Sequence, residues 1–188
     1  MRISNAQVKR NRERVIGAAS ELFRAKGFDA VAVGDLMNTA GFTHGGFYNH
    51  FDSKEALAGA ALQSAWSEMA KERTRAPDLP RLLTSYLSRA ARKAPGKTCP
   101  AAALAGDVGR LPKAVKTVFA QGLEDMIRSI EERLPANTDV PGRERAVNAV
   151  TRMVGALMLS RAVPDDAPLG DELLDSTLRG LLRDLSRP

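Results

Sequence analysis

The stretch GFTHGGFYNHF, residues 41–51, places three glycines, both histidines and an aromatic cluster between two segments with helical periodicity. Phe47 and Phe51 are four residues apart, so in a helix they share one face, which we expect to turn toward a core. Thr43 precedes the segment and is of a type that often caps the start of a helix. The sequence therefore predicts two helical turns that begin after Thr43.

The segments before this stretch have the pattern of a long helix followed by a short one. From about residue 7 to residue 26, apolar residues recur at the spacing of an amphipathic helix. These residues are Val15, Ala19, Leu22 and Phe23. Gly27 favours a left-handed stop, and Phe28 can pack behind it. Residues 33–40 form the short apolar-faced segment, which Gly41 ends.

The rest of the chain keeps the helical period between loops rich in Pro, Asp and Gly. Ser53 is expected to cap a long helix that continues to about Arg73. Further helices are expected at residues 81–93, 100–109, 112–130 and 143–163 and in a last segment that ends near Leu185. No segment shows the alternation of a strand. The prediction is an all-α chain of about nine helices.

The composition favours a partner that carries negative charge. The chain has 188 residues and a formal net charge of +6, which fits nucleic acid or an anionic membrane surface. No apolar run approaches the roughly 18 residues that span a bilayer, and the N-terminus lacks the apolar segment of a signal peptide. No basic amphipathic helix stands out beyond the N-terminal segment. We therefore expect a cytoplasmic protein that does not bind membranes.

The side chains that could act in catalysis or bind a metal do not form a recognisable catalytic or metal-binding pattern. Cys99 is the only cysteine, so neither an intrachain disulfide nor a thiolate zinc site is expected. His44 and His50 would lie on different faces of a helix, without a third ligand. The sequence has no phosphate loop and no Gly-x-Ser-x-Gly motif. We expect no enzyme, no metal and no cofactor.

Two short helices joined by a tight glycine-containing turn and packed on a longer helix are typical of a helix-turn-helix unit, whose second helix enters the DNA major groove. A glycine at the start of that helix lets the backbone approach DNA closely. The outward residues would be His44, Gly45, Tyr48 and Asn49, with His50 to one side and Lys54 just beyond. Asparagine can read adenine, and Tyr, His and Lys side chains suit phosphate oxygens.

A basic run precedes the first apolar stripe. Its members are Lys9, Arg10, Arg12 and Arg14, diluted only by Glu13. We expect it to form a positive arm that strengthens DNA binding without reading sequence. Taken alone, the run also fits a solvated N-terminal arm, and residues 41–51 also fit a glycine-rich loop with a surface aromatic side chain.

Residues 12–57, RERVIGAASELFRAKGFDAVAVGDLMNTAGFTHGGFYNHFDSKEAL, combine F-x-x-x-G-F/Y, A-G-hydrophobic-T/S, Y-x-H-F and S-K-E-x-L. In these motifs the stretch resembles the N-terminal domain of the TetR (tetracycline-repressor-like) family. The resemblance implies a helix-turn-helix DNA-binding domain at residues 1–52 and a helical effector-binding and dimerisation domain at residues 53–188. It also implies base contacts from Thr43, His44, Gly45 and Asn49, and phosphate contacts from Tyr48, His50 and Lys54. One departure is the pair Val31 and Ala32, which replaces the usual Ser or Thr cap of the second helix.

The last two helices have apolar stripes that could form a homodimer interface of four helices. The stripes are Ala146, Val150, Met153, Val154 and Leu157, then Leu174, Leu178, Leu181, Leu182 and Leu185. Alternatively, both stripes pack inside one subunit. A dimer with two recognition helices predicts a palindromic operator.

The resemblance implies a small-molecule pocket, for which the sequence offers large side chains on the helices expected to enclose it. The candidates are Trp66, Tyr86, Phe119, Met126 and Met153. Each of them also fits simple core packing. Asp107, Arg110 and Arg128 are polar candidates that would otherwise be solvated.

Cys99 is a separate candidate, because Pro100 fits the first position of a helix and so puts Cys99 at its N-cap. There the helix dipole and Lys97 would favour a thiolate, and the residue could sense oxidants or electrophiles. The alternative is an inert thiol.

The sequence thus predicts a homodimeric, sequence-specific transcriptional regulator, a repressor that a small-molecule effector releases from its operator. Two alternatives stay open: a repressor that senses oxidants or electrophiles through Cys99, and an architectural DNA-binding protein without an effector. The latter would have little use for more than a hundred residues of helical domain after the DNA-reading unit.

Overall fold

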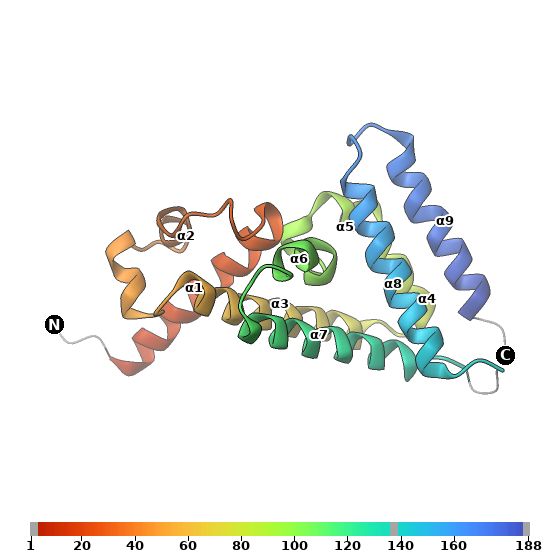
Figure 1. Ribbon diagram of the computed structural model, residues 1–188, viewed down its shortest axis with the longest axis horizontal. Helices are drawn as coiled ribbons and strands as arrows, with labels where there is room; N and C mark the ends of the chain where they lie inside the picture. The colour runs from red at the N-terminus through yellow and green to blue at the C-terminus, as the bar shows by residue number, and fades with distance from the viewer. Residues whose placement is uncertain (1–3, 136–138, 186–188) are drawn as a thin grey trace.

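The computed structural model describes residues 4–135 and 139–185, and in this part of the chain every regular element is helical (Figure 1). Nine α-helices and two short 3-10 helices follow one another there, which confirms the all-α prediction. The elements are α1 (Asn5–Lys26), α2 (Val33–Thr39), η1 (His44–Asn49), α3 (Lys54–Arg75), α4 (Leu79–Tyr86), α5 (Arg89–Lys93), η2 (Pro95–Lys97), α6 (Pro100–Val108), α7 (Lys113–Glu131), α8 (Gly142–Arg161) and α9 (Pro168–Leu185).

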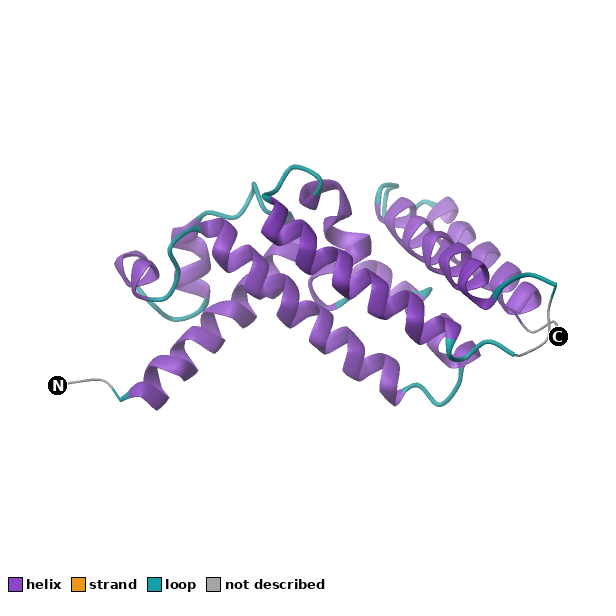
Figure 2. Ribbon diagram, turned by 60° about the horizontal axis from the view of Figure 1, so that its bottom comes forward, coloured by secondary structure: helices purple, strands orange, loops and turns teal. Residues whose placement is uncertain are grey.

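The helices form an elongated body with different elements at its two ends (Figure 1). The start of α1, α2 and the segment that contains η1 lie at one end, and α8 and α9 lie side by side at the other (Figures 1 and 2). The long helix α3 packs against α1 and also against α7. The helix α3 therefore connects α1 with α7 in the middle of the molecule.

The helix ends follow local sequence signals. Ser4 caps α1 by accepting a hydrogen bond from the Gln7 N–H at 3.2 Å, and Ser53 caps α3 through the Ala56 N–H at 3.1 Å. Gly27 ends α1 with a φ of 82°, a left-handed backbone that costs glycine little. The helix α2 begins at Val33, and its N-cap residue Ala32, which stands where a Ser or Thr is usual, makes no side-chain cap hydrogen bond.

Two local predictions were wrong. The helix expected at residues 81–93 is interrupted: α4 ends at Tyr86, and Ser88 starts α5 by accepting a hydrogen bond from the Ala91 N–H at 3.1 Å. A serine that caps a new helix competes with continuation of the old one. The turns after Thr43 form a 3-10 helix, and Thr43 occupies the N-cap position without a side-chain cap bond.

The buried apolar side chains of the described residues form one continuous cluster. It includes Phe51 and Leu57, so the core runs across the predicted boundary between residues 52 and 53, which stays a prediction. No helix in the described part is long and apolar enough to cross a bilayer.

Most side chains of the two stripes expected to form a dimer interface are buried within the chain itself. Ala146, Val150, Met153 and Leu157 of α8 and Leu174, Leu181 and Leu185 of α9 are buried, and Val154, Leu178 and Leu182 are half-buried. The alternative, packing inside one subunit, is therefore correct for the buried side chains, and a dimer through these helices stays a prediction. The apolar side chains that α8 leaves exposed are different ones, namely Val147, Met158 and Leu159.

Candidate nucleic-acid interface and ligand cavity

The 3-10 helix η1 has one apolar face and one polar face. Phe47 is 1% exposed and Phe51 is 4% exposed, and their ring centroids are 5.9 Å apart. Tyr48 meets the edge of Phe47 at 5.2 Å but keeps 70% of its surface exposed. His44, Gly45 and Asn49 are also exposed. The phenylalanines thus anchor a short element whose polar side chains face solvent.

Neither the space around Gly45 nor its backbone conformation requires a glycine at this position. A Cβ atom built on it meets nothing within 4 Å, and its φ is not positive. Gly41, by contrast, has a φ of 79°, which a side chain would strain. The space over Gly45 therefore belongs to the outer surface of η1.

The remaining candidate DNA contacts lie beside this surface but are less exposed. His50 is half-buried; its ring lies 6.4 Å from that of Phe42, and its Nδ1 is buried without a hydrogen-bond partner in the described chain. Lys54 is half-buried at the first position of α3. Among the described residues, no group of three His, Cys, Asp or Glu side chains could bind a metal.

Two arginines of the basic run are fixed against the aromatic cluster. The guanidinium of Arg12 lies 4.6 Å from the ring centroid of Phe51, and that of Arg14 lies 4.8 Å from the ring centroid of Phe42. Such contacts hold a cation at an exposed site with modest energy. The positive charge of α1 is therefore continuous with the surface of η1, which a freely solvated arm would not provide.

A cavity of about 710 Å³ lies between the end of α3, α4, α5, η2 and Leu157 of α8. Its size is in the range of small-molecule sites. Of the five predicted pocket residues, Tyr86 lines this cavity. Trp66 lines a second one of about 380 Å³ against α7, and Phe119 packs on Trp66 at 5.9 Å. Met126 and Met153 are buried in the core and line neither cavity.

Two unpartnered polar groups lie at or near the larger cavity, since Tyr86 lines it and Arg161 is close to Tyr86. The Tyr86 hydroxyl and Arg161 Nη1 are buried and have no hydrogen-bond partner in the described chain. Burial raises the pKa of Tyr86 well above its ordinary value and lowers the pKa values of Arg73 and Arg161. Arg161 is held by the Ala91 carbonyl at 2.7 Å and by the Thr98 hydroxyl.

Cys99 occupies the predicted N-cap position of α6, but it faces inward. Its side chain makes no cap hydrogen bond and is 2% exposed. The sulfur lies 4.0 Å from the Met126 sulfur and near the Tyr86 hydroxyl, outside hydrogen-bonding geometry. This burial favours the inert-thiol alternative, and the sensing role stays a prediction.

A set of polar contacts that the sequence did not reveal joins α1 to the cavity. Arg24 is buried in α1, pairs with Glu68 of α3 at 2.8 Å and donates to the Thr98 carbonyl at 3.0 Å. Asp107 of α6 accepts a hydrogen bond from the Phe28 N–H at 3.2 Å. Asp107 is therefore a contact to the end of α1, whereas Arg110 and Arg128 are exposed. Because these charges fall at ordinary helical positions, periodicity gives no sign of them.

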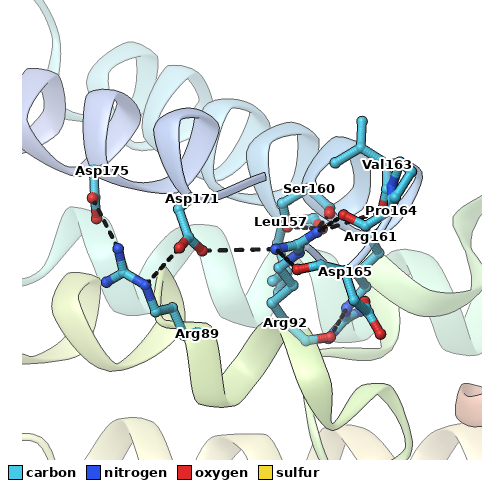
Figure 3. A network of polar contacts seen from close by, with 10 residues as sticks. All are labelled: Arg89, Arg92, Leu157, Ser160, Arg161, Val163, Pro164, Asp165, Asp171 and Asp175. Carbon is cyan, nitrogen blue, oxygen red and sulfur yellow. Dashed lines mark hydrogen bonds and ion pairs between the residues drawn. The ribbon is translucent and has the colours of Figure 1, made fainter. Parts of the chain in front are cut away.

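A second buried arginine connects α5 to the segment after α8 (Figure 3). Arg92 donates to the carbonyls of Ser160 at 2.7 Å, Asp165 at 3.3 Å, Val163 at 3.4 Å and Pro164 at 2.8 Å. Asp171 lies 3.7 Å away as its only carboxylate neighbour among the described residues. The carbonyls that follow a helix lack intrahelical partners, so this one cation satisfies several of them.

The sequence profile described as "Bacterial regulatory proteins, tetR family" matches residues 15–61. These residues run from the buried part of α1 through α2 and η1 into α3. In this N-terminal part the chain is therefore similar to the TetR family.

Two curated relatives are HTH-type transcription regulators by name. The chain is 25% identical over 127 residues to the HTH-type transcriptional repressor DhaR of Mycobacterium sp. (strain GP1), a match that covers 64% of each chain. It is 40% identical over 52 residues to the uncharacterized HTH-type transcriptional regulator YerO of Bacillus subtilis (strain 168), or 28% of this chain and 18% of YerO. Both matches cover less than two thirds of the relative's own length.

Solved structures extend the likeness in fold over the whole chain. The reduced form of NemR from E. coli has a TM-score of 0.78 at 19% identity and covers 95% of this chain and 98% of its own. A TetR-family regulator from Cytophaga hutchinsonii has a TM-score of 0.78 at 18% identity, with both chains covered completely. At these identities the likeness concerns the TetR fold alone.

Proposed function

We propose that the chain is a sequence-specific DNA-binding transcriptional regulator, a repressor that a small-molecule effector releases from its operator. The observation that carries the proposal is the two-faced η1: Phe47 and Phe51 fix it on the core, while Tyr48 and Asn49 project into solvent. The partial match to a protein named as a transcriptional repressor supports the direction of control.

In this proposal η1 enters the major groove and the basic surface of α1 lies along the phosphates. Asn49 supplies two hydrogen-bonding groups suited to a base edge, and Tyr48, His50 and Lys54 suit phosphate oxygens. Gly45 leaves room for the DNA backbone or bases close to the η1 main chain. Thr43 and His44 are exposed at the start of η1, where they can reach the groove.

We further propose that two copies pair through α8 and α9 and so read a palindromic operator. The support is the set of exposed apolar side chains on these helices, Val147, Met158 and Leu159 of α8 and Leu169 of α9, since most of the others are buried within the chain. Burial of such side chains against a second copy would remove them from water.

Effector release requires a connection between the cavity and η1. Thr98 lines the cavity, and its carbonyl accepts from Arg24 of α1, which is paired with Glu68 of α3. A ligand that changes the position of Thr98 therefore acts on α1 and α3 together. It shifts the equilibrium only as far as its affinity differs between the two states.

The experiment is selection of bound duplexes from a random DNA library, followed by fluorescence-anisotropy titration of the enriched duplex. We expect one palindromic sequence to bind tightly, and binding to weaken about tenfold or more when Tyr48→Ala and Lys54→Ala are combined. Loss of a lysine–phosphate contact should also lower the slope of log affinity against log salt by about one.

Lys71→Ala is the matched control, because Lys71 is an exposed lysine near the other end of α3 and should leave binding unchanged. Equal affinity for the enriched duplex and a scrambled one would contradict sequence-specific binding and favour the architectural alternative. An unchanged affinity in the Tyr48→Ala, Lys54→Ala variant would contradict the role of η1.

A further inference from the structure

The side chains that line the cavity beside Tyr86 carry a net positive charge. Five ionisable side chains line its wall without being fully buried, and four of them are basic: Arg73, Arg75, Arg81 and Lys97, against Glu72. Glu72 already pairs with Arg75 at 2.5 Å. Arg73 forms no ion pair with a carboxylate in the described ranges of the chain, although Asp125 is close enough to favour its charged form.

Tyr86 adds a further hydrogen-bond donor to the cavity wall. Its hydroxyl is buried without a partner in the described chain, and Arg73 and Arg161 are each close enough to act on it electrostatically. A buried hydroxyl without a partner costs free energy, and an anionic acceptor bound to it would remove this cost.

The rest of the wall is apolar. It consists of Met69, Ala76, Leu82, Ala90, Ala91, Ala94 and Leu157 together with a few small polar side chains. This part of the wall has no charged group to pair with a second ligand charge, and its apolar side chains can bury hydrocarbon.

We infer that the cavity binds an amphipathic organic acid, with its carboxylate at Tyr86 and Arg73 and its hydrocarbon part along the alanine and leucine side chains. A guanidinium and a hydroxyl together match the two oxygens of a carboxylate. The inference deepens the proposed function and rests on it for the effect on DNA, whereas binding of the acid is a property of the cavity alone.

The test is isothermal titration calorimetry of the full chain, without DNA, using decanoate, its uncharged amide decanamide and inorganic phosphate. We expect decanoate to bind at one site per chain with a dissociation constant below about 1 mM, and the amide and phosphate to bind at least about tenfold more weakly. Tyr86→Phe and Arg73→Gln should each weaken decanoate binding about tenfold or more.

Arg75→Gln is the matched control: Arg75 lines the same cavity, but its side chain is 72% exposed and already paired, so decanoate affinity should change little. Thermal melts establish that Tyr86→Phe and Arg73→Gln remain folded. Should one of them unfold the chain, the decanoate-to-decanamide affinity ratio of the wild type still decides the matter.

Equal affinity for decanoate and decanamide would overturn the inference, as would no decanoate binding at about 1 mM. If phosphate bound as strongly as decanoate, the claim that the hydrocarbon part of the acid contributes to binding would be overturned. If decanoate binds but does not release the enriched duplex, the ligand class stands and effector control of DNA binding fails. If no DNA is bound at all, calorimetry alone still decides the inference.

Discussion

The end of the molecule that carries η1 and the middle of the molecule place their polar and charged side chains in opposite ways. At the η1 end, Tyr48, Asn49 and the basic run project from a surface whose underside is apolar. In the middle, Arg24 and Arg92 are buried, and their donors are met mainly by main-chain carbonyls and hydroxyls. The first arrangement keeps polar groups free for a partner, and the second uses charge to connect helices.

This difference is sharpest in α5, where two arginines three residues apart have opposite environments (Figure 3). The Arg92 side chain is 4% exposed and the Arg89 side chain is 62% exposed. Arg89 forms ion pairs with Asp171 at 2.8 Å and Asp175 at 3.5 Å. The number of ion pairs alone would suggest that Arg89 contributes more to the stability of the fold. The burial of Arg92 and its contacts with carbonyl groups indicate instead that Arg92 contributes more.

The largest expected effect is that of Arg92→Ala. The substitution leaves several main-chain carbonyls after α8 without a donor, so we expect the free energy of unfolding to fall by on the order of 3–5 kcal/mol. Chemical denaturation followed by circular dichroism measures it. Arg89→Ala is the control and should have little effect, because exposed ion pairs are screened by solvent. Equal losses in the two variants would remove the distinction between buried and exposed charge.

Replacing either of two helical glycines by alanine should change the free energy of unfolding less than Arg92→Ala does, and the two substitutions should act in opposite directions. A Cβ at Gly122 would lie 2.3 Å from the Trp66 ring, whereas one at Gly59 meets nothing within 4 Å. Gly122→Ala should therefore destabilise the chain by about 1–3 kcal/mol through overpacking of α3 against α7. Gly59→Ala should stabilise it by about 0.5–1 kcal/mol, because alanine is the better helix former.

Thermal and chemical denaturation of the two glycine variants test this packing. Combining Gly122→Ala with Trp66→Leu should restore part of the lost stability, because the smaller side chain makes room for the added methyl group. Stabilisation by both single substitutions would show that Trp66 does not press against Gly122.

The contrast between the two regions also explains what the sequence could predict. The stripes of α1 and α2, the stops at Gly27 and Gly41 and the Ser53 cap follow from local rules, so these elements were found. The outward face of η1 was found for the same reason, because Phe47 and Phe51 define which side is inside.

The errors arose where the partner of a side chain is distant in sequence. The α8 stripe at Ala146 and Leu157 shows that one side is buried, but periodicity does not say whether the partner is the same chain or a second copy. Likewise Arg24 meets Glu68 and Thr98 only after α1, α3 and η2 are brought together. The break before Ser88 was missed because its flanking residues continue the helical period.

The most direct test of the account is the DNA affinity of Gly45→Ala, measured by fluorescence anisotropy with the enriched duplex and compared with Gly59→Ala. Neither added Cβ comes within 4 Å of another atom of the described residues, so both variants should stay folded. If η1 approaches DNA through its main chain, Gly45→Ala weakens binding about tenfold or more while Gly59→Ala leaves it unchanged. Wild-type affinity in Gly45→Ala would contradict the claim that η1 is the DNA-reading element.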